Sequence, residues 1–176
     1  TGGNNTAIGT NTLTANTSGQ YNTAIGSLAL TANTTASGNS ALGYAALDAV
    51  TTSTGHTALG YLALTSVTSG NNNTAVGYNA GANISSGGQN VVVGTLALDA
   101  LTTGHNNTAL GHQSMTANTT GGNNVGIGRD ALAGNTTADN NTGIGYFALN
   151  SNTTGKENTA VGANSLDTNT TGDRNT

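Results

Sequence analysis

Hydrophobic positions recur along this chain at one fixed distance. An aliphatic residue followed by glycine recurs at a constant interval, which equals the distance between Gly9 and Gly26. This spacing is kept as far as Gly162 without insertion or deletion. Five residues after each of these aliphatics comes a second large apolar residue, which is leucine or methionine in every unit except the one containing Gly81. Thr, Asn and Gly fill most of the remaining positions. This pattern indicates a repeat protein built from ten copies of one unit.

The units form a single array over residues 1–176. Their bounds are 5–21, 22–38, 39–55, 56–72, 73–89, 90–106, 107–123, 124–140, 141–157 and 158–174. The residues before and after them are fragments of the same unit, and neither end carries the atypical capping unit that solenoids use. We therefore expect an internal segment of a longer fibre.

The length of the unit predicts the fold class. Seventeen residues are too few for a helical pair, and Thr, Asn and Gly all disfavour helix. The unit fits one coil of an all-β, parallel β-solenoid (β-roll), with a short strand, a glycine bend, a second short segment and a polar return. Stacked coils would bring identical columns about 4.8 Å apart, so ten coils predict a rod roughly 48 Å long.

Two apolar columns are predicted to form the core, and one glycine column the bends. The first apolar column is Ile8, Ile25, Leu42, Leu59, Val76, Val93, Leu110, Ile127, Ile144 and Val161. The second is Leu13, Leu30, Leu47, Leu64, Leu98, Met115, Leu132, Leu149 and Leu166. The turn glycines are Gly9, Gly26, Gly43, Gly60, Gly77, Gly94, Gly111, Gly128, Gly145 and Gly162, where we expect a positive φ or a close approach of backbones.

The energetics of such a thin rod favour association. Each coil offers about two large aliphatic side chains, worth roughly 1.5–3 kcal/mol apiece when fully buried. Ordering the backbone costs roughly 1–2 kcal/mol per residue. Sharing a core between chains would reduce the difference between this entropy cost and the gain from burial, so a homo-oligomer is predicted. In four adjacent units the column that is otherwise Asn changes to Val50, Val67, Ile84 and Leu101, which suggests local burial, with a seam between chains as one interpretation.

Composition narrows the chemistry. Thr, Asn and Gly make up half of the chain, charged residues only 6%, and the net charge is −4. The absence of cysteine excludes a disulfide scaffold, a thiolate zinc site and a cysteine nucleophile. No apolar run approaches the ~18 residues of a membrane span, and no basic cluster indicates nucleic acid binding. We therefore expect neither membrane insertion by this segment nor nucleic acid binding.

Candidate catalytic groups are few and scattered. His56, His105 and His112 fall in three different columns and are interpreted as surface substitutions, with His56 in place of an Asn. Asp48, Asp99 and Asp167 share one column, but three or four coils separate them. Paired acid–base chemistry needs much closer groups. No enzyme activity, cofactor or metal is predicted.

One aromatic column is a candidate contact stripe. Tyr44, Tyr61 and Tyr78 occupy it in three consecutive units, and Tyr146 joins it later. One interpretation is an exposed stripe that touches a glycan or a protein partner. The other is stacking of the tyrosines on one another, or a contact between subunits.

The core of the unit resembles a known family. Asn5-Thr6-Ala7-Ile8-Gly9 and Asn158-Thr159-Ala160-Val161-Gly162 are similar to the head repeats of trimeric autotransporter adhesins, the YadA-like β-roll. Asn73-Thr74-Ala75-Val76-Gly77-Tyr78 is similar to repeats of bacteriophage tail fibres and related bacterial fibre proteins. This resemblance implies a left-handed homotrimer in an extracellular fibre, on a bacterial cell surface or a virion, that binds a host surface glycan or matrix.

The expected function is therefore structural. The chain is predicted to be a shaft or head segment that rigidly presents a host- or matrix-binding tip. Two alternatives stay open. One is a Thr-rich solenoid that binds polysaccharide or ice, and the other is a self-assembling extracellular filament.

Overall fold

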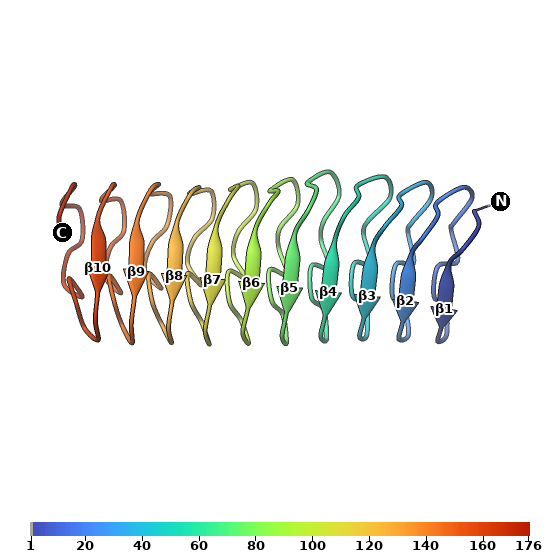
Figure 1. Ribbon diagram of the computed structural model, residues 1–176, viewed down its shortest axis with the longest axis horizontal. Coiled ribbons are helices and arrows are strands. Elements are labelled where there is room, and N and C mark those ends of the chain that lie inside the picture. The colour runs from blue at the N-terminus through green and yellow to red at the C-terminus, as the bar shows by residue number, and fades with distance from the viewer. Residues whose placement is uncertain (1) are drawn as a thin grey trace.

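The computed structural model describes residues 2–176, which form a parallel β-solenoid (Figure 1). Each coil contributes one three-residue strand, and no helix occurs among the described residues. The strands are β1 (Thr6–Ile8), β2 (Thr23–Ile25), β3 (Ser40–Leu42), β4 (Thr57–Leu59), β5 (Thr74–Val76), β6 (Val91–Val93), β7 (Thr108–Leu110), β8 (Val125–Ile127), β9 (Thr142–Ile144) and β10 (Thr159–Val161). The predicted all-β solenoid is confirmed.

The strands stack in chain order into one ten-stranded sheet along the rod. Every pair is parallel and shifted by one unit, as in Ala24 opposite Ala41. Hydrogen bonds between coils continue beyond the strands. The N–H of Leu30 donates to the Ala46 carbonyl at 3.1 Å, and the N–H of Gly43 donates to the Ile25 carbonyl at 2.8 Å. Each coil is therefore fastened to the next around most of its circumference.

The second apolar column forms the core, as predicted. Its fully buried members are Leu30, Leu47, Leu64, Leu98, Met115, Leu132 and Leu149. Leu13 and Leu166 are partly buried and pack against them. The central residue of the strands also points inward, and it is small in most coils, as at Ala24, Ala58 and Ala109. The interior is narrow, with one large apolar residue per coil in this column except in the coil of Gly81.

The first apolar column lies outside the core, and the prediction that it is buried is wrong. Ile8, Leu42, Leu59, Ile127 and Val161 are exposed, and Ile25, Val76, Val93, Leu110 and Ile144 are half-buried. The cause is the alternation of side chains along a strand. Because the central alanine points inward, the Thr before it and the aliphatic after it both point outward.

The local burial expected for the column of Val50, Val67, Ile84 and Leu101 is confirmed, and it lies inside the coils of a single chain, not at a seam between chains. All four side chains are fully buried within the coils. Ile84 also occupies the space left by the missing leucine of that unit. A Cβ atom added to Gly81 would lie 2.9 Å from Ile84 Cδ1.

The predicted turn glycines are confirmed as bends. Their φ values lie between 128° and 145°, a region that residues with a side chain rarely adopt. The coils also pack too closely there for a side chain. A Cβ atom added to Gly128 would lie 2.5 Å from the carbonyl oxygen of Gly145.

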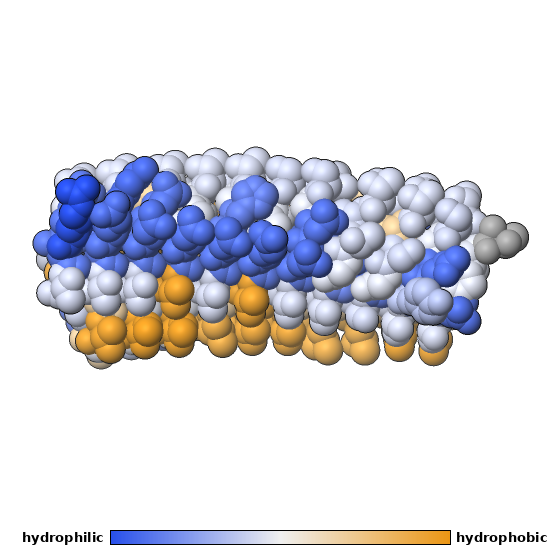
Figure 2. Space-filling model, turned by 45° about the horizontal axis from the view of Figure 1, so that its top comes forward, coloured by the Kyte–Doolittle hydropathy of each residue, from blue (hydrophilic) through white to orange (hydrophobic). Residues whose placement is uncertain are grey.

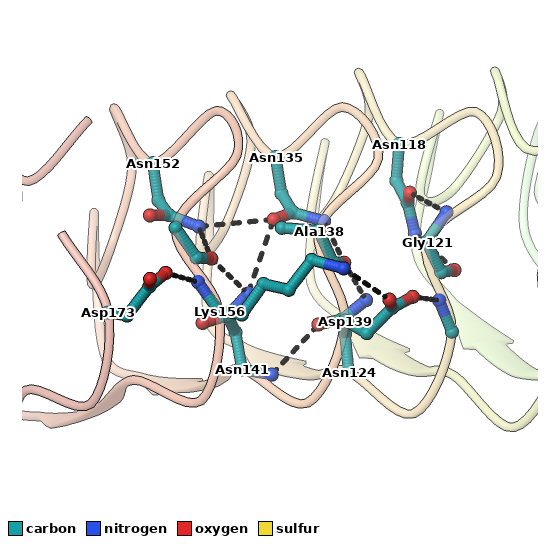
Figure 3. Close-up of polar contacts among 12 residues, drawn as sticks. Asn118, Gly121, Asn124, Asn135, Ala138, Asp139, Asn141, Asn152, Lys156 and Asp173 are labelled. Carbon is teal, nitrogen blue, oxygen red and sulfur yellow. Dashed lines mark hydrogen bonds and ion pairs between the residues drawn. The ribbon is translucent and has the colours of Figure 1, made fainter. Parts of the chain in front are cut away.

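Buried asparagines close each coil from within (Figure 3). Oδ1 of Asn124 accepts the backbone N–H of Asn141, in the next coil, at 2.9 Å. Nδ2 of Asn124 donates to the carbonyl of Ala138 at 2.8 Å, and Nδ2 of Asn135 donates to the same carbonyl at 3.1 Å. These asparagines are fully buried, and their amides satisfy backbone groups that no strand pairs.

The core leucines adopt an uncommon backbone conformation. Leu30, Leu47 and Leu149 have φ values of 51°, 54° and 52°, in the left-handed region. For a residue with a side chain this conformation costs roughly 1–2 kcal/mol. Burial of the leucine side chain offsets the cost and directs it into the coil.

Candidate functional site

The outward side of the sheet is the most regular surface of the molecule. We define the aliphatic face as the first and third residues of the ten strands. The third residues are the aliphatic column given above, and the first are Thr6, Thr23, Ser40, Thr57, Thr74, Val91, Thr108, Val125, Thr142 and Thr159. Figure 2 shows the aliphatic side chains as one continuous orange row along the rod.

The aliphatic face is shallow, and it pairs one aliphatic row with a row that is Thr or Ser in eight of the ten strands. Leu42 and Leu59 are 48% and 46% exposed. A groove between the two rows crosses β2, β3 and β4, with Ala41 and Ala58 at its floor. Soluble monomers rarely expose an apolar strip of such length, and strips of this kind mark contact surfaces.

Charged side chains lie elsewhere on the rod. None of the twenty residues of the aliphatic face is charged, and most charged residues fall between Arg129 and Arg174. In Figure 2 hydrophilic side chains lie above the orange row and are most intensely coloured toward the C-terminal end. Lys156 Nζ binds Asp139 Oδ2 at 3.1 Å, and Arg174 Nε binds Glu157 Oε2 at 2.9 Å. These pairs join neighbouring coils at exposed corners.

The candidate tyrosine stripe is a stack. The ring centroids of Tyr44 and Tyr61 lie 5.2 Å apart and those of Tyr61 and Tyr78 lie 5.3 Å apart, with nearly parallel planes. All three rings are about half exposed. Tyr146 stands apart from them, against Phe147 and under the guanidinium of Arg129. The first three tyrosines therefore stack on one another, as one of the two interpretations proposed.

His56 is buried, so its interpretation as a surface substitution is wrong. It occupies the place of a ladder asparagine, and its backbone N–H donates to Asn39 Oδ1 at 2.9 Å. Its Nε2 lies 3.2 Å from Ser53 Oγ, and its Nδ1 accepts the N–H of Asn73 at 3.3 Å. Burial of the ring, which disfavours its charged form, lowers the pKa of His56 to about 4. The ring is therefore neutral near pH 7.

The remaining candidate groups do not converge. His112 is exposed, and His105 Nδ1 accepts the N–H of Gly88 at 2.9 Å. Of the aspartate column, Asp99 accepts the hydroxyl of Thr116 at 2.7 Å. Within residues 2–176 no three histidine or carboxylate side chains lie close enough to hold a metal ion. The geometry gathers no catalytic constellation at these residues.

One polar pattern has a period of two coils, which the sequence analysis missed. In every second coil a side chain at the same position accepts a backbone N–H from the preceding coil, and these side chains are Ser37, Asn71, His105, Asp139 and Asp173. The pKa of Asp139 is lowered mainly by the hydrogen bond from the Gly122 N–H, and further by the hydrogen bond and charge of Lys156. In the sequence the alternation is visible only from Gly88 onward, where Gly88, Gly122 and Lys156 alternate with the acceptors, because Gln20 and Thr54 in the earlier units also carry acceptor oxygens.

Comparisons with known proteins complete the description. No protein-family model, curated protein or solved structure matches this chain. Among the described residues there is also no helix long and apolar enough to cross a membrane.

Proposed function

We propose that this chain is a structural segment of a surface fibre, the shaft or head of a bacterial adhesin or phage tail fibre. It holds a host- or matrix-binding tip at a distance from the surface that carries it. The observation that carries the proposal is the ladder of ten strands, each displaced from the last by one repeat unit. No coil is interrupted by an inserted loop.

The bonds between coils explain how such a segment would resist bending. Neighbouring coils are joined through the strands, through the bends and through the buried asparagines. Bending the rod would lengthen these bonds on one side and compress them on the other. Stacks of parallel strands owe their stability to the same feature, because every strand forms hydrogen bonds to the strands above and below it.

The finer features of the proposal rest on the resemblance of the repeats to trimeric adhesin heads and tail fibres. They are a homotrimer of left-handed rolls, an extracellular location, and contact with a host glycan or matrix. The exposed stack of Tyr44, Tyr61 and Tyr78 is the proposed place for glycan contact. The chain acts mechanically in this proposal, without enzyme activity.

Small-angle scattering and electron microscopy test the proposal. The wild-type chain should be a rod about 48 Å long. Deletion of residues 73–123 removes three whole coils and should shorten the rod by about 14 Å while keeping its cross-section. A compact particle, or a rod whose length does not follow the number of coils, would contradict a structural rod.

A further inference from the structure

We propose that the aliphatic face is the surface through which copies of this chain pack side by side. The proposal rests on the fibre function and names the surface that the assembled fibre would use. Its occupant is a second copy of the same rod, with the long axes aligned. The aliphatic rows of the two copies then exclude water from each other.

Comparison between coils shows that the exposed aliphatic row is under a constraint. All ten coils carry Ile, Leu or Val at this position, although the side chain points away from the core. Two residues further along, an equally outward position holds residues as different as Ser27, Tyr44, Arg129 and Ala163. The fold of a single chain explains the buried leucines but not the outward aliphatics. Contact with another apolar surface explains them.

The dimensions of the aliphatic face suit a contact between rods. Ten strands span about 48 Å, and two outward rows are about 10 Å across. Each copy would therefore bury roughly 500 Å², and a pair about 1,000 Å², near the lower limit for a specific interface. Three copies around one axis would bury more, because each rod would meet two others.

A second copy also matches the face in spacing and in charge. Both rods have the same rise per coil, so the ridges of one meet the spaces of the other along the full length. None of the residues on the face is charged, and the ion pairs of Lys156 and Arg174 lie at exposed corners of the coils. Packing two such faces leaves no buried unpaired charge.

The mass of the protein in solution tests the proposal. By light scattering the wild-type chain should have a mass of two or more times 17.1 kDa. The double variant L59D/I127D places charges on two exposed side chains of the face, and its mass should fall to that of one chain. The control T52D/T120D has the same spacing along the rod, at exposed positions outside the face, and should keep the wild-type mass.

Circular dichroism establishes that both double variants retain the coil. If L59D/I127D loses its β signal, L59T/I127T replaces it, because Thr already occupies outward positions of the same strands. A single-chain mass for the wild type from low to high micromolar concentration overturns the proposal, as does association that L59D/I127D leaves unchanged.

Two other occupants of the face are separate outcomes of the same experiment. Thermal hysteresis, or binding to an insoluble polysaccharide, by a single-chain wild type and its loss in L59D/I127D would assign the face to that ligand and overturn self-association. A single chain that is still a rod about 48 Å long leaves the fibre function standing. A compact particle contradicts the fibre function itself.

Discussion

Nδ1 of His56 accepts the backbone N–H of Asn73 at 3.3 Å, in a ladder where an asparagine oxygen does so in the other described coils, as Asn124 does for Asn141. An imidazole can accept this bond only while Nδ1 lacks a proton. Protonation therefore removes a hydrogen bond and places a charge in the interior of the rod.

This relationship predicts a loss of stability in acid. The pKa of His56 falls from 6.5 to about 4 in the folded chain. Because the unfolded chain takes up the proton first, the free energy of unfolding should decrease as the pH falls from about 6.5 to 4 and then level off. A shift of this size corresponds to about 3 kcal/mol. Urea unfolding at a series of pH values measures it.

The control for the acid effect is His56→Asn, which restores the ladder residue. Its stability should change far less over the same pH interval. Asp139, whose pKa is lowered by the Gly122 hydrogen bond and by Lys156, titrates at more acidic pH and is present in both proteins. Parallel pH profiles for the two proteins would show that His56 is not the cause.

The glycine bends predict a sharp difference between two alanine substitutions. Gly128→Ala introduces a Cβ atom 2.5 Å from the Gly145 oxygen, at a φ of 128°. Gly38 has a φ of 72°, but an added Cβ meets no atom within 4 Å. Gly38→Ala should cost about 1 kcal/mol, from backbone strain alone. Gly128→Ala should cost at least about 2–3 kcal/mol in thermal unfolding, because the coils must also separate. Equal costs would contradict the close approach.

The junction between the asparagine and valine columns predicts a second pair of substitutions. Asn33 Oδ1 is buried without a donor, because the next coil has Val50 where an asparagine would supply one. Val50→Asn would satisfy Asn33 and transfer the unsatisfied oxygen one coil further. Val67→Asn would lie between two apolar side chains, Val50 and Ile84, and add a new unsatisfied group.

Chemical denaturation distinguishes the two asparagine variants. Val67→Asn should be less stable than Val50→Asn by about 1–3 kcal/mol, the cost of one buried polar group without a partner. The two variants lose the same valine side chain from equivalent, fully buried positions. An equal loss of stability in both variants would mean that an unbroken asparagine ladder does not stabilise the rod.

The tyrosine stack predicts unequal effects of equal truncations. Tyr61 has a ring on each side, whereas Tyr78 has a stacked ring on one side only. Each such contact is worth about 0.5–1.5 kcal/mol beyond the area that it buries. Tyr61→Ala should therefore destabilise the rod by about 0.5–1.5 kcal/mol more than Tyr78→Ala. Thermal unfolding followed by circular dichroism measures the difference, and identical losses would contradict stacking as a stabilising contact.

The periodicity of the sequence was sufficient to predict the stacking of coils. A pairing such as Ala24 with Ala41 follows from a period without insertions, since any other register would break every column at once. The bends at the glycines and the burial of the leucine column follow from the same regularity. These features depend on the repeat as a whole and not on any single coil.

The direction of the outward column needed the structure. In a strand such as Thr-Ala-Leu, hydrophobicity alone gives two apolar neighbours, of which only one can point inward. The narrow interior takes Ala58 and leaves Leu59 outside. The size of the side chain decides which of the two residues points inward. The width available for it depends on contacts between residues that are distant within the unit. The left-handed conformation of Leu47 was equally hidden, because local propensity disfavours it.

The uniform displacement between coils also bears on how such a rod can change over generations. Neighbouring coils all keep the same strand register, so loss or duplication of whole units would leave the strand ladder in register. Recombination between neighbouring repeats would then alter the reach of the molecule in steps of about 4.8 Å. The repeat makes length a variable trait that can be tuned without redesigning the fold.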